Sequence, residues 1–80
     1  MNITQTIKLR IEELCSERNI TMNKMCMICG ITQSTINNII NRDQKDVYLL
    51  TVVIICNGLG ISIFDFFNCE IFKNRIEEEI

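Results

Sequence analysis

The chain has 80 residues, a formal net charge of −2 at pH 7, and 48% hydrophobic residues. These values fit one small domain with a core, and they exclude an intrinsically disordered chain. The longest apolar run, around VVIIC, is shorter than the ~20 residues that span a bilayer, and the N-terminus lacks the layout of a signal peptide. We therefore expect a cytoplasmic protein with no membrane partner. The slight acidity argues against non-specific binding to polyanions, although local patches matter more than the total charge.

The cysteine pattern predicts free thiols in the core. The count of five is odd, and no export signal accompanies it. The segment CMIC, Cys26 to Cys29, has the spacing of a metal or redox motif. A structural zinc site needs four ligands, and without histidine the others would have to come from Cys15, Cys56 and Cys69. A thioredoxin-like site would need a preceding strand, and none is predicted. We expect no metal and no cofactor.

Catalytic motifs are also missing from the sequence. It has no histidine, no nucleophile elbow and no glycine-rich phosphate loop. We therefore do not expect an enzyme.

The first predicted element is an amphipathic helix that ends near residues 18–19. Its apolar stripe has helical spacing and consists of Ile3, Ile7, Ile11 and Leu14. The charged residues that we place off this stripe are Lys8, Arg10, Glu12, Glu13 and Glu17.

Two short helices are predicted next, with a tight turn between them. Thr21 is a suitable N-cap for a helix over 22–29, and Gly30 suits the left-handed position after it. Thr32 then caps a helix over 33–41. Only three residues separate the two helices, which is the helix-turn-helix arrangement.

Packing of this unit is expected to follow its apolar side chains. The residues that should point inward are Met25, Ile31, Ile36 and Ile39. Cys26 and Cys29 should lie where the helix passes close to a neighbour, because free cysteine behaves as a small hydrophobe.

The later segments predict three more helices. LLTVVIICNGL, over 49–59, is apolar on most sides and could also be a buried strand, but its length and the following Gly60 favour a buried helix. Ser62 is expected to cap a short helix over 63–67. The last segment, NCEIFKNRIEEEI, has an apolar stripe made of Cys69, Phe72, Ile76 and Ile80.

The segments RIEELCSERNITMNKMCMICGITQSTINNIINR and LGISIFDFF together resemble the Cro/phage-repressor-like, or XRE-type, helix-turn-helix family over about residues 7–67. The resemblance implies an all-α fold, a compact five- to six-helix bundle of the lambda-repressor-like DNA-binding type. We assign residues 1–67 to the helix-turn-helix DNA-binding domain, and 68–80 to a C-terminal amphipathic helix of the same domain.

Three departures from the family pattern stand out. Cys15 and Ile40 occupy positions where the family often has an Arg–Glu ion pair, and replacing both partners by apolar groups costs little. We expect these two side chains to touch. Val47 and Tyr48 replace a common Pro-Ser helix start, and Met22 replaces a polar residue near the phosphate backbone.

The resemblance implies that the third helix enters the major groove of double-stranded DNA. Amide side chains bind adenine bidentately, and hydroxyls bind either base edge. The expected base contacts are Gln33, Ser34, Asn37 and Asn38. The expected phosphate contacts are Thr21, Asn23, Thr32, Asn41, Arg42 and Lys45.

The sequence leaves two functions open. The first is a sequence-specific DNA-binding transcriptional regulator that represses by occupying a promoter. The second is a protein-interaction module on the same fold, such as an antitoxin-like or anti-repressor-like component. It would bind another protein through Met22, Phe66, Phe67 and the C-terminal helix.

A regulator that reads two-fold DNA sites is expected to be a homodimer. The region from Ile63 onward is the candidate interface, because it lies outside the helix-turn-helix. The expected interface residues are Phe64, Phe67, Phe72, Ile76 and Ile80. The alternative is that Phe72 and Ile76 fold back as ordinary core.

Overall fold

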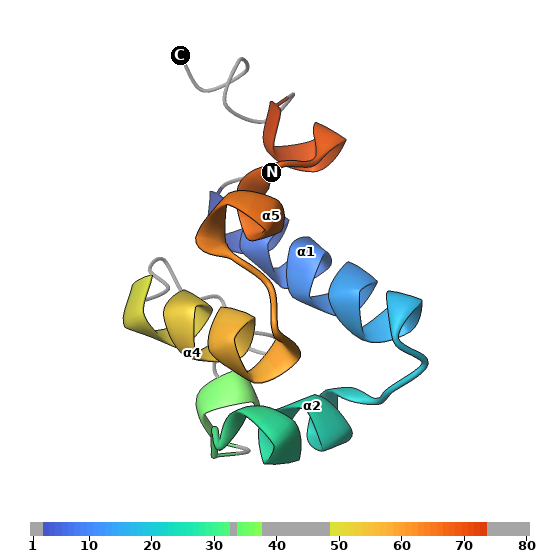
Figure 1. Cartoon of the computed structure of the whole chain (residues 1–80), viewed down its shortest axis with the longest axis vertical. Coiled ribbons are helices and arrows are strands. Elements are labelled where there is room, and N and C mark those ends of the chain that lie inside the picture. Colours follow the sequence, from blue (N-terminus) through green and yellow to red (C-terminus); the bar gives the residue numbers. More distant parts are fainter. Residues whose placement is uncertain (1–2, 33, 38–48, 74–80) are drawn as a thin grey trace.

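The computed structural model describes residues 3–32, 34–37 and 49–73, and within these ranges it contains helices and no strands. The helices are α1 (Ile3–Glu17), α2 (Met22–Cys29), α4 (Leu49–Leu59) and α5 (Ile63–Phe67). Residues 34–37 and 70–73 are also helical. The α2 helix lies at one end of the molecule below α4, and α5 lies towards the other end beside α1 (Figure 1). The all-α prediction is confirmed, and no helix in these ranges is long and apolar enough to cross a membrane.

The predicted helix boundaries are confirmed at their caps. The hydroxyl oxygens of Thr21 and Ser62 each accept a hydrogen bond from the backbone amide three residues later, at 3.0 Å. These bonds satisfy an amide that has no partner within the helix. Gly30 and Gly60 follow α2 and α4 with φ values of 71° and 74°. A residue with a Cβ rarely adopts this left-handed backbone, so both helices end where glycine is present.

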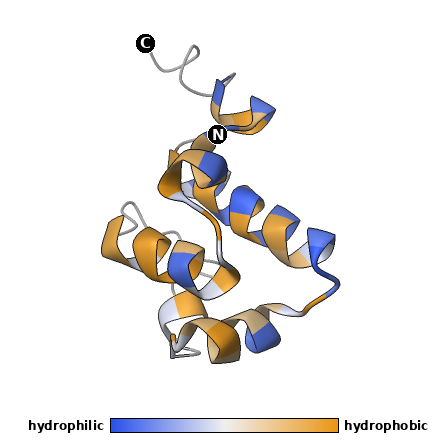
Figure 2. Cartoon of the chain, viewed as in Figure 1, coloured by the Kyte–Doolittle hydropathy of each residue, from blue (hydrophilic) through white to orange (hydrophobic). Residues whose placement is uncertain are grey.

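A single hydrophobic core joins all of these helices. Its buried members are Ile7, Ile11, Leu14, Cys15, Met25, Cys26, Ile36, Val52, Ile55, Cys56, Phe66 and Phe72. Colouring by hydropathy shows that α4 is apolar around most of its surface, whereas α1 alternates between polar and apolar residues (Figure 2). The prediction of a helix rather than a strand at 49–59 is confirmed. The expected burial of this helix does not extend to its first turn, where Leu49 and Leu50 are 64% and 68% exposed.

The predicted apolar stripe of α1 is wrong at its first residue, and one basic residue expected outside the stripe is buried. Ile3 is 40% exposed, whereas Thr4 and Thr6 are buried. Arg10, expected on the polar side, is only 8% exposed. The inward face of α1 is therefore partly polar.

Arg10 is buried because its guanidinium bonds to the end of α5. Its Nε atom donates to the carbonyl oxygen of Phe66 at 2.7 Å, and Nη2 donates to the carbonyl oxygen of Asp65 at 2.8 Å. Its Nη1 atom donates to the carboxylate of Glu13, and the cation lies 6.0 Å from the centre of the Phe66 ring. Carbonyls at a helix C-terminus lack partners within the helix. A cation there is also attracted by the negative end of the helix dipole. One side chain thus joins α1 to α5.

Replacing Arg10 with alanine should lower the free energy of unfolding by about 3 kcal/mol, because two carbonyls would lose charge-assisted hydrogen bonds. Urea denaturation followed by circular dichroism measures this change. Glu12→Ala is the control, because Glu12 is an exposed charged residue of the same helix. If Arg10→Ala and Glu12→Ala lowered the free energy of unfolding equally, the structural role of Arg10 would be contradicted.

The α2 and α4 helices approach closely at Cys29 and Gly58. A Cβ atom built on Gly58 would lie 2.4 Å from the Cys29 Sγ atom and 2.7 Å from the Cys29 Cα atom. The Cys29 thiol also donates a weak hydrogen bond to the carbonyl oxygen of Ile55, at 3.6 Å. The expected close approach of the cysteine face of α2 is therefore confirmed, and glycine at position 58 is what permits it.

Gly58→Ala should destabilise the fold by about 1–3 kcal/mol, even though alanine favours helix formation by about 1 kcal/mol over glycine. Adding Cys29→Ala should not restore stability, because the second overlap involves the Cys29 Cα atom rather than its sulfur. Thermal denaturation of wild type, single and double variants measures both effects. A stabilised Gly58→Ala variant would refute the close crossing.

Candidate nucleic-acid interface

The α2 helix, the turn after it and the helical residues 34–37 form a helix-turn-helix unit. The backbone amides of Gly30 and Ile31 both bond to the carbonyl oxygen of Cys26, the latter at 3.0 Å, and this closes the turn. Met25 and Ile36 are fully buried, at 0% exposed, and anchor the two helical segments in the core. The inward orientation of these two residues is confirmed, and Ile31 is half-buried as part of the same packing. Ile39 lies outside the described residues.

Anchoring Ile36 turns the neighbouring polar side chains outward. Ser34 and Asn37 are both exposed and lie three residues apart, so they share one side of the helical turn. The other two expected base contacts, Gln33 and Asn38, lie outside the described residues.

The Thr32 hydroxyl organises the start of this helical turn. Its Oγ1 atom accepts from the backbone amide of Thr35 at 3.3 Å and lies 2.8 Å from the Thr35 hydroxyl oxygen. It also lies 3.3 Å from the Ser34 hydroxyl oxygen. A hydroxyl has one donor and two acceptor positions, so these three partners use its full capacity. Thr32 therefore acts as a cap, as predicted, and its side chain is already engaged.

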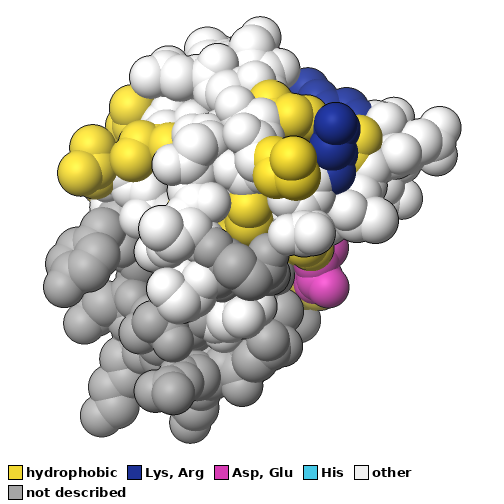
Figure 3. All heavy atoms as spheres, turned by 90° about the horizontal axis from the view of Figure 1, so that it is seen from below, with side chains coloured by type: hydrophobic (Ala, Val, Ile, Leu, Met, Phe, Trp, Pro, Cys, Tyr) yellow, Lys and Arg dark blue, Asp and Glu magenta, His cyan; other side chains and the backbone are white. Residues whose placement is uncertain are grey.

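The first turn of α2 presents polar groups beside the turn of the unit. Thr21, Asn23 and Lys24 are all exposed there. Lys24 was not among the sequence-predicted contacts, although a lysine in the first turn of the second helix could have indicated it. Seen from the α2 end, the basic atoms lie together beside hydrophobic ones, and acidic atoms lie nearby (Figure 3). Asn41, Arg42 and Lys45 lie outside the described residues.

Met22 begins α2 but turns towards the interior. It is half-buried, and its Sδ atom accepts a hydrogen bond from the Cys15 thiol at 3.4 Å. Cys15 itself is 4% exposed. Cys15 is therefore in the interior, but its expected contact with Ile40 stays a prediction, because Ile40 lies outside the described residues.

Four thiols lie around the contacts of α1, α2 and α4. Burial raises the pKa of each above its ordinary value, and the group consists of Cys15, Cys26, Cys29 and Cys56. In the described part of the chain, no group of three or more His, Cys, Asp or Glu residues is placed to hold a metal ion. Protonated, buried thiols of this kind pack as small apolar groups.

A raised thiol pKa means that the folded state holds its protons more tightly than the unfolded chain. Stability should therefore be constant below the ordinary thiol pKa of about 8.5 and fall as the pH rises above it. Thermal denaturation across this range measures the decline. The variant Cys26→Ala/Cys56→Ala should decline less steeply, because two of the four thiols are gone. An equal decline in both proteins would show that other groups cause it.

The expected dimer surface is only partly available. Phe64 is 71% exposed and Phe67 is half-buried. Phe72 is 1% exposed, with its ring centre 4.8 Å from that of Phe67, so its assignment to the dimer interface is wrong. The short link after α5 folds Phe72 back onto the core, which was the stated alternative. Ile76 and Ile80 lie outside the described residues.

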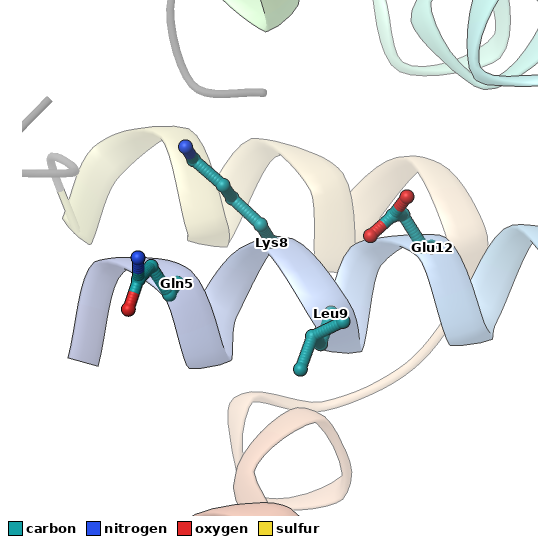
Figure 4. A pocket seen from close by; sticks show the side chains of 4 residues that line it. All are labelled: Gln5, Lys8, Leu9 and Glu12. Atoms are coloured by element: carbon teal, nitrogen blue, oxygen red, sulfur yellow. The ribbon is translucent and has the colours of Figure 1, made fainter. Parts of the chain in front are cut away.

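A hollow of about 510 Å³ runs along the outer face of α1, lined by Gln5, Lys8, Leu9 and Glu12 (Figure 4). All four side chains come from one helix, and Lys8 and Glu12 have opposite charges one turn apart. No second element in the described ranges supplies a lining residue, so we assign this hollow no binding role.

Residues 10–71 match the family model of the Cro/C1-type HTH DNA-binding domain. The chain belongs to this family. The solved structure titled "Crystal structure of the prophage Lp1 protein 11" is similar to it, with a TM-score of 0.78 and 30% sequence identity. The alignment covers 86% of this chain and 92% of that one. No curated protein sequence matches. The family match of the Cro/C1-type domain begins at Arg10 and runs past α5, so it includes the contact that joins α1 to α5.

Proposed function

We propose that the chain is a sequence-specific DNA-binding transcriptional regulator that represses by occupying its site. The observation that carries this proposal is the polar face formed by Ser34 and Asn37, held outward by the buried Ile36, within a Cro/C1-type domain. A face of short amides and hydroxyls has the hydrogen-bonding groups that bind base edges.

In this proposal, the helix that contains residues 34–37 lies in the major groove. In helix-turn-helix proteins, the N-terminal part of the second helix contacts the bases, and the first helix crosses the backbone. The proposed base contacts are Gln33, Ser34, Asn37 and Asn38. Amides favour adenine and hydroxyls accept several bases, so we expect a site that includes A·T pairs.

Phosphate contacts would fix the orientation of the unit on DNA. Thr21 uses its side chain to cap α2, and Thr32 uses its own to cap the next helix. We therefore propose that both contribute through nearby backbone amides at the helix N-termini, which attract phosphate. Asn23 and Lys24 are exposed on the same turn of α2 and add side-chain contacts. Asn41, Arg42 and Lys45 complete the proposed set.

The alternative of a protein-interaction module has less support. Of the residues assigned to that role, Phe66 is 0% exposed and Met22 is turned towards Cys15. Met22 and Phe67 are both half-buried. Burial of Phe66 and half-burial of the other two side chains reduce the described surface on which that function would depend.

Selection of bound duplexes from a random pool tests DNA reading. Asn37→Ala should weaken binding to the selected duplex by about 1–3 kcal/mol and leave binding to an unrelated duplex nearly unchanged. Lys24→Ala should weaken binding to both duplexes by the same factor and reduce the dependence of binding on salt. Mobility shifts at several salt concentrations measure these affinities.

The control for these variants is Gln5→Ala, which removes an exposed amide on α1, away from the helix-turn-helix. It should bind both duplexes like wild type. If wild type bound no duplex even at low salt, the proposed function would be wrong. If Asn37→Ala weakened binding to every duplex equally, the assignment of Asn37 as a base contact would be wrong. The proposal that the protein binds DNA would not be affected.

A further inference from the structure

Asn57 is the one asparagine in the sequence that is followed by a glycine. Asparagine is thermolabile because the backbone nitrogen of the next residue can attack its side-chain Cγ atom. A side chain on that next residue hinders the attack, and Gly58 has none. Asn57 is also exposed on α4, so water can reach its amide group. This pair therefore has the chemistry that spontaneous deamidation requires.

The intact α4 helix opposes this reaction. Inside an α-helix, the amide of Gly58 is directed at the carbonyl four residues earlier, so its nitrogen is not free to attack. The attack requires that this hydrogen bond break and that the backbone of Asn57 leave its helical conformation. The reaction therefore depends on how often this part of α4 opens.

The pair lies in the last turn of α4, which a small set of backbone bonds closes. The helix ends one residue before Gly60, which has a φ of 74°. The carbonyl of Asn57 accepts a hydrogen bond from the amide of Gly60 at 3.4 Å. The carbonyl of Cys56 accepts one from the amide of Ile61 at 3.0 Å. Local opening at a helix end costs much less free energy than unfolding of the whole domain, so this turn opens while the rest stays folded.

We propose that Asn57 is a deamidation site whose reaction is controlled by opening of the last turn of α4. The Gly58 nitrogen loses its proton and forms a bond to the Asn57 Cγ atom. The bond from Cγ to the side-chain nitrogen breaks, and ammonia leaves. Water then opens the resulting cyclic imide at either of its carbonyls. One product is aspartate, and the other is isoaspartate, in which the main chain runs through the side-chain carbons.

Both products weaken the contact between α2 and α4. Isoaspartate lengthens the main chain directly before Gly58, where even an added Cβ atom would lie 2.4 Å from the Cys29 Sγ atom. A closely packed crossing does not accommodate a backbone of different length. Aspartate instead places a negative charge near the C-terminus of α4, where the helix dipole repels it. Deamidation therefore loosens the crossing that supports the helix-turn-helix unit.

The consequence for DNA binding rests on the proposed function. Packing of α2 against α4 directs Ser34 and Asn37 outward, so a chain with a loosened crossing loses its proposed base contacts. Because the released ammonia does not return, each copy is inactivated once and permanently. Opening of one helical turn thus limits the working life of the protein.

Peptide mapping by mass spectrometry after incubation at neutral pH measures the reaction. Replacement of the side-chain NH₂ by OH raises the peptide mass, and enzymatic methylation identifies isoaspartate. Asn57 should be converted about 10-fold more slowly in the folded protein than in the chain unfolded by guanidinium. Asn23 is the internal control, because it is exposed on α2 but precedes a lysine, and it should stay unmodified. Asn57→Gln should resist conversion, because its longer side chain closes the ring poorly.

Alanine substitutions at two glycines test control by the last turn. Gly30 and Gly60 have φ values of 71° and 74°, and a Cβ atom on either would meet nothing within 4 Å, so both variants carry the same backbone strain. Gly60→Ala strains the closure of α4 and should speed conversion of Asn57 about 5-fold. Gly30→Ala strains the end of α2 and should speed it less.

Wild type gives the same test if either glycine variant fails to fold. Opening of one turn exposes little surface, so the rate at Asn57 should change little with urea below the unfolding transition. A rate that instead follows the globally unfolded fraction would overturn control by the last turn.

Purified deamidated protein tests the consequence for the fold and for DNA. Its melting temperature should be lower than that of wild type. The isoaspartate form should also melt below Asn57→Asp, which carries the charge without the longer main chain. The isoaspartate form should lose specific binding to the selected duplex.

The remaining outcomes separate the inference from the proposed function. If Asn57 stayed unmodified in the folded protein while the unfolded chain was converted, the fold would close the site and the inference would be wrong. Equal acceleration in Gly30→Ala and Gly60→Ala would assign the reaction to global unfolding. A deamidated protein as stable as wild type would refute the loosened crossing. Wild type that binds no duplex would count against the proposed function alone, because mass and melting temperature are measured without DNA.

Discussion

The close approach of α2 to α4 at Cys29 and Gly58 is the contact on which the candidate site depends. Cys29 directly precedes Gly30, and the turn at Gly30 sets the direction of the helical residues that follow. Because Gly58 has no side chain, the backbones of the two helices can meet and hold this turn against the core. The outward direction of Ser34 and Asn37 is thus a consequence of packing at α4, which itself makes none of the proposed base contacts.

Arg10 performs a comparable task at the other end of the molecule. A helix as short as α5 has little stability of its own, because it forms few internal hydrogen bonds. Its carbonyls instead accept bonds from the Arg10 guanidinium, and Phe66 and Phe72 fill the core beneath it. The same contacts that stabilise α5 also leave Phe64 in solvent. The helix-turn-helix unit at one end of the domain and α5 towards the other are therefore positioned by a shared core.

Sulfur-containing side chains fill much of that core between the helices. The Cys15 thiol meets the Met22 thioether at 3.4 Å, and the Cys29 thiol meets the Met25 thioether at 3.7 Å. Cysteine and methionine are polarisable and adapt to irregular gaps, which suits helices that cross closely. The buried Cys15 side chain carries no charge that would need a partner in the interior. The chain thus keeps the helix-turn-helix arrangement with an apolar interior at this position.

The sequence by itself determined the helices, their caps and the family. These features depend on local chemistry: a threonine or serine satisfies the first amides of a helix, and glycine adopts the left-handed backbone after it. The exposure of the polar residues Ser34 and Asn37 was also predictable, because helical spacing places both away from the side of the helix that carries Ile36. Thr21 and Ser62 acted as caps where the pattern indicated them.

Only the tertiary structure decided which side chains the domain covers. A charged residue off the apolar stripe, Arg10, became buried because the end of a distant helix supplies two acceptors, which periodicity within α1 cannot reveal. Phe72 and Phe64 look equally apolar in the sequence, yet one fills the core and the other remains in solvent. That difference depends on how the chain folds back after α5. Contacts between residues far apart in the sequence, rather than local pattern, therefore determined which apolar side chains stay exposed.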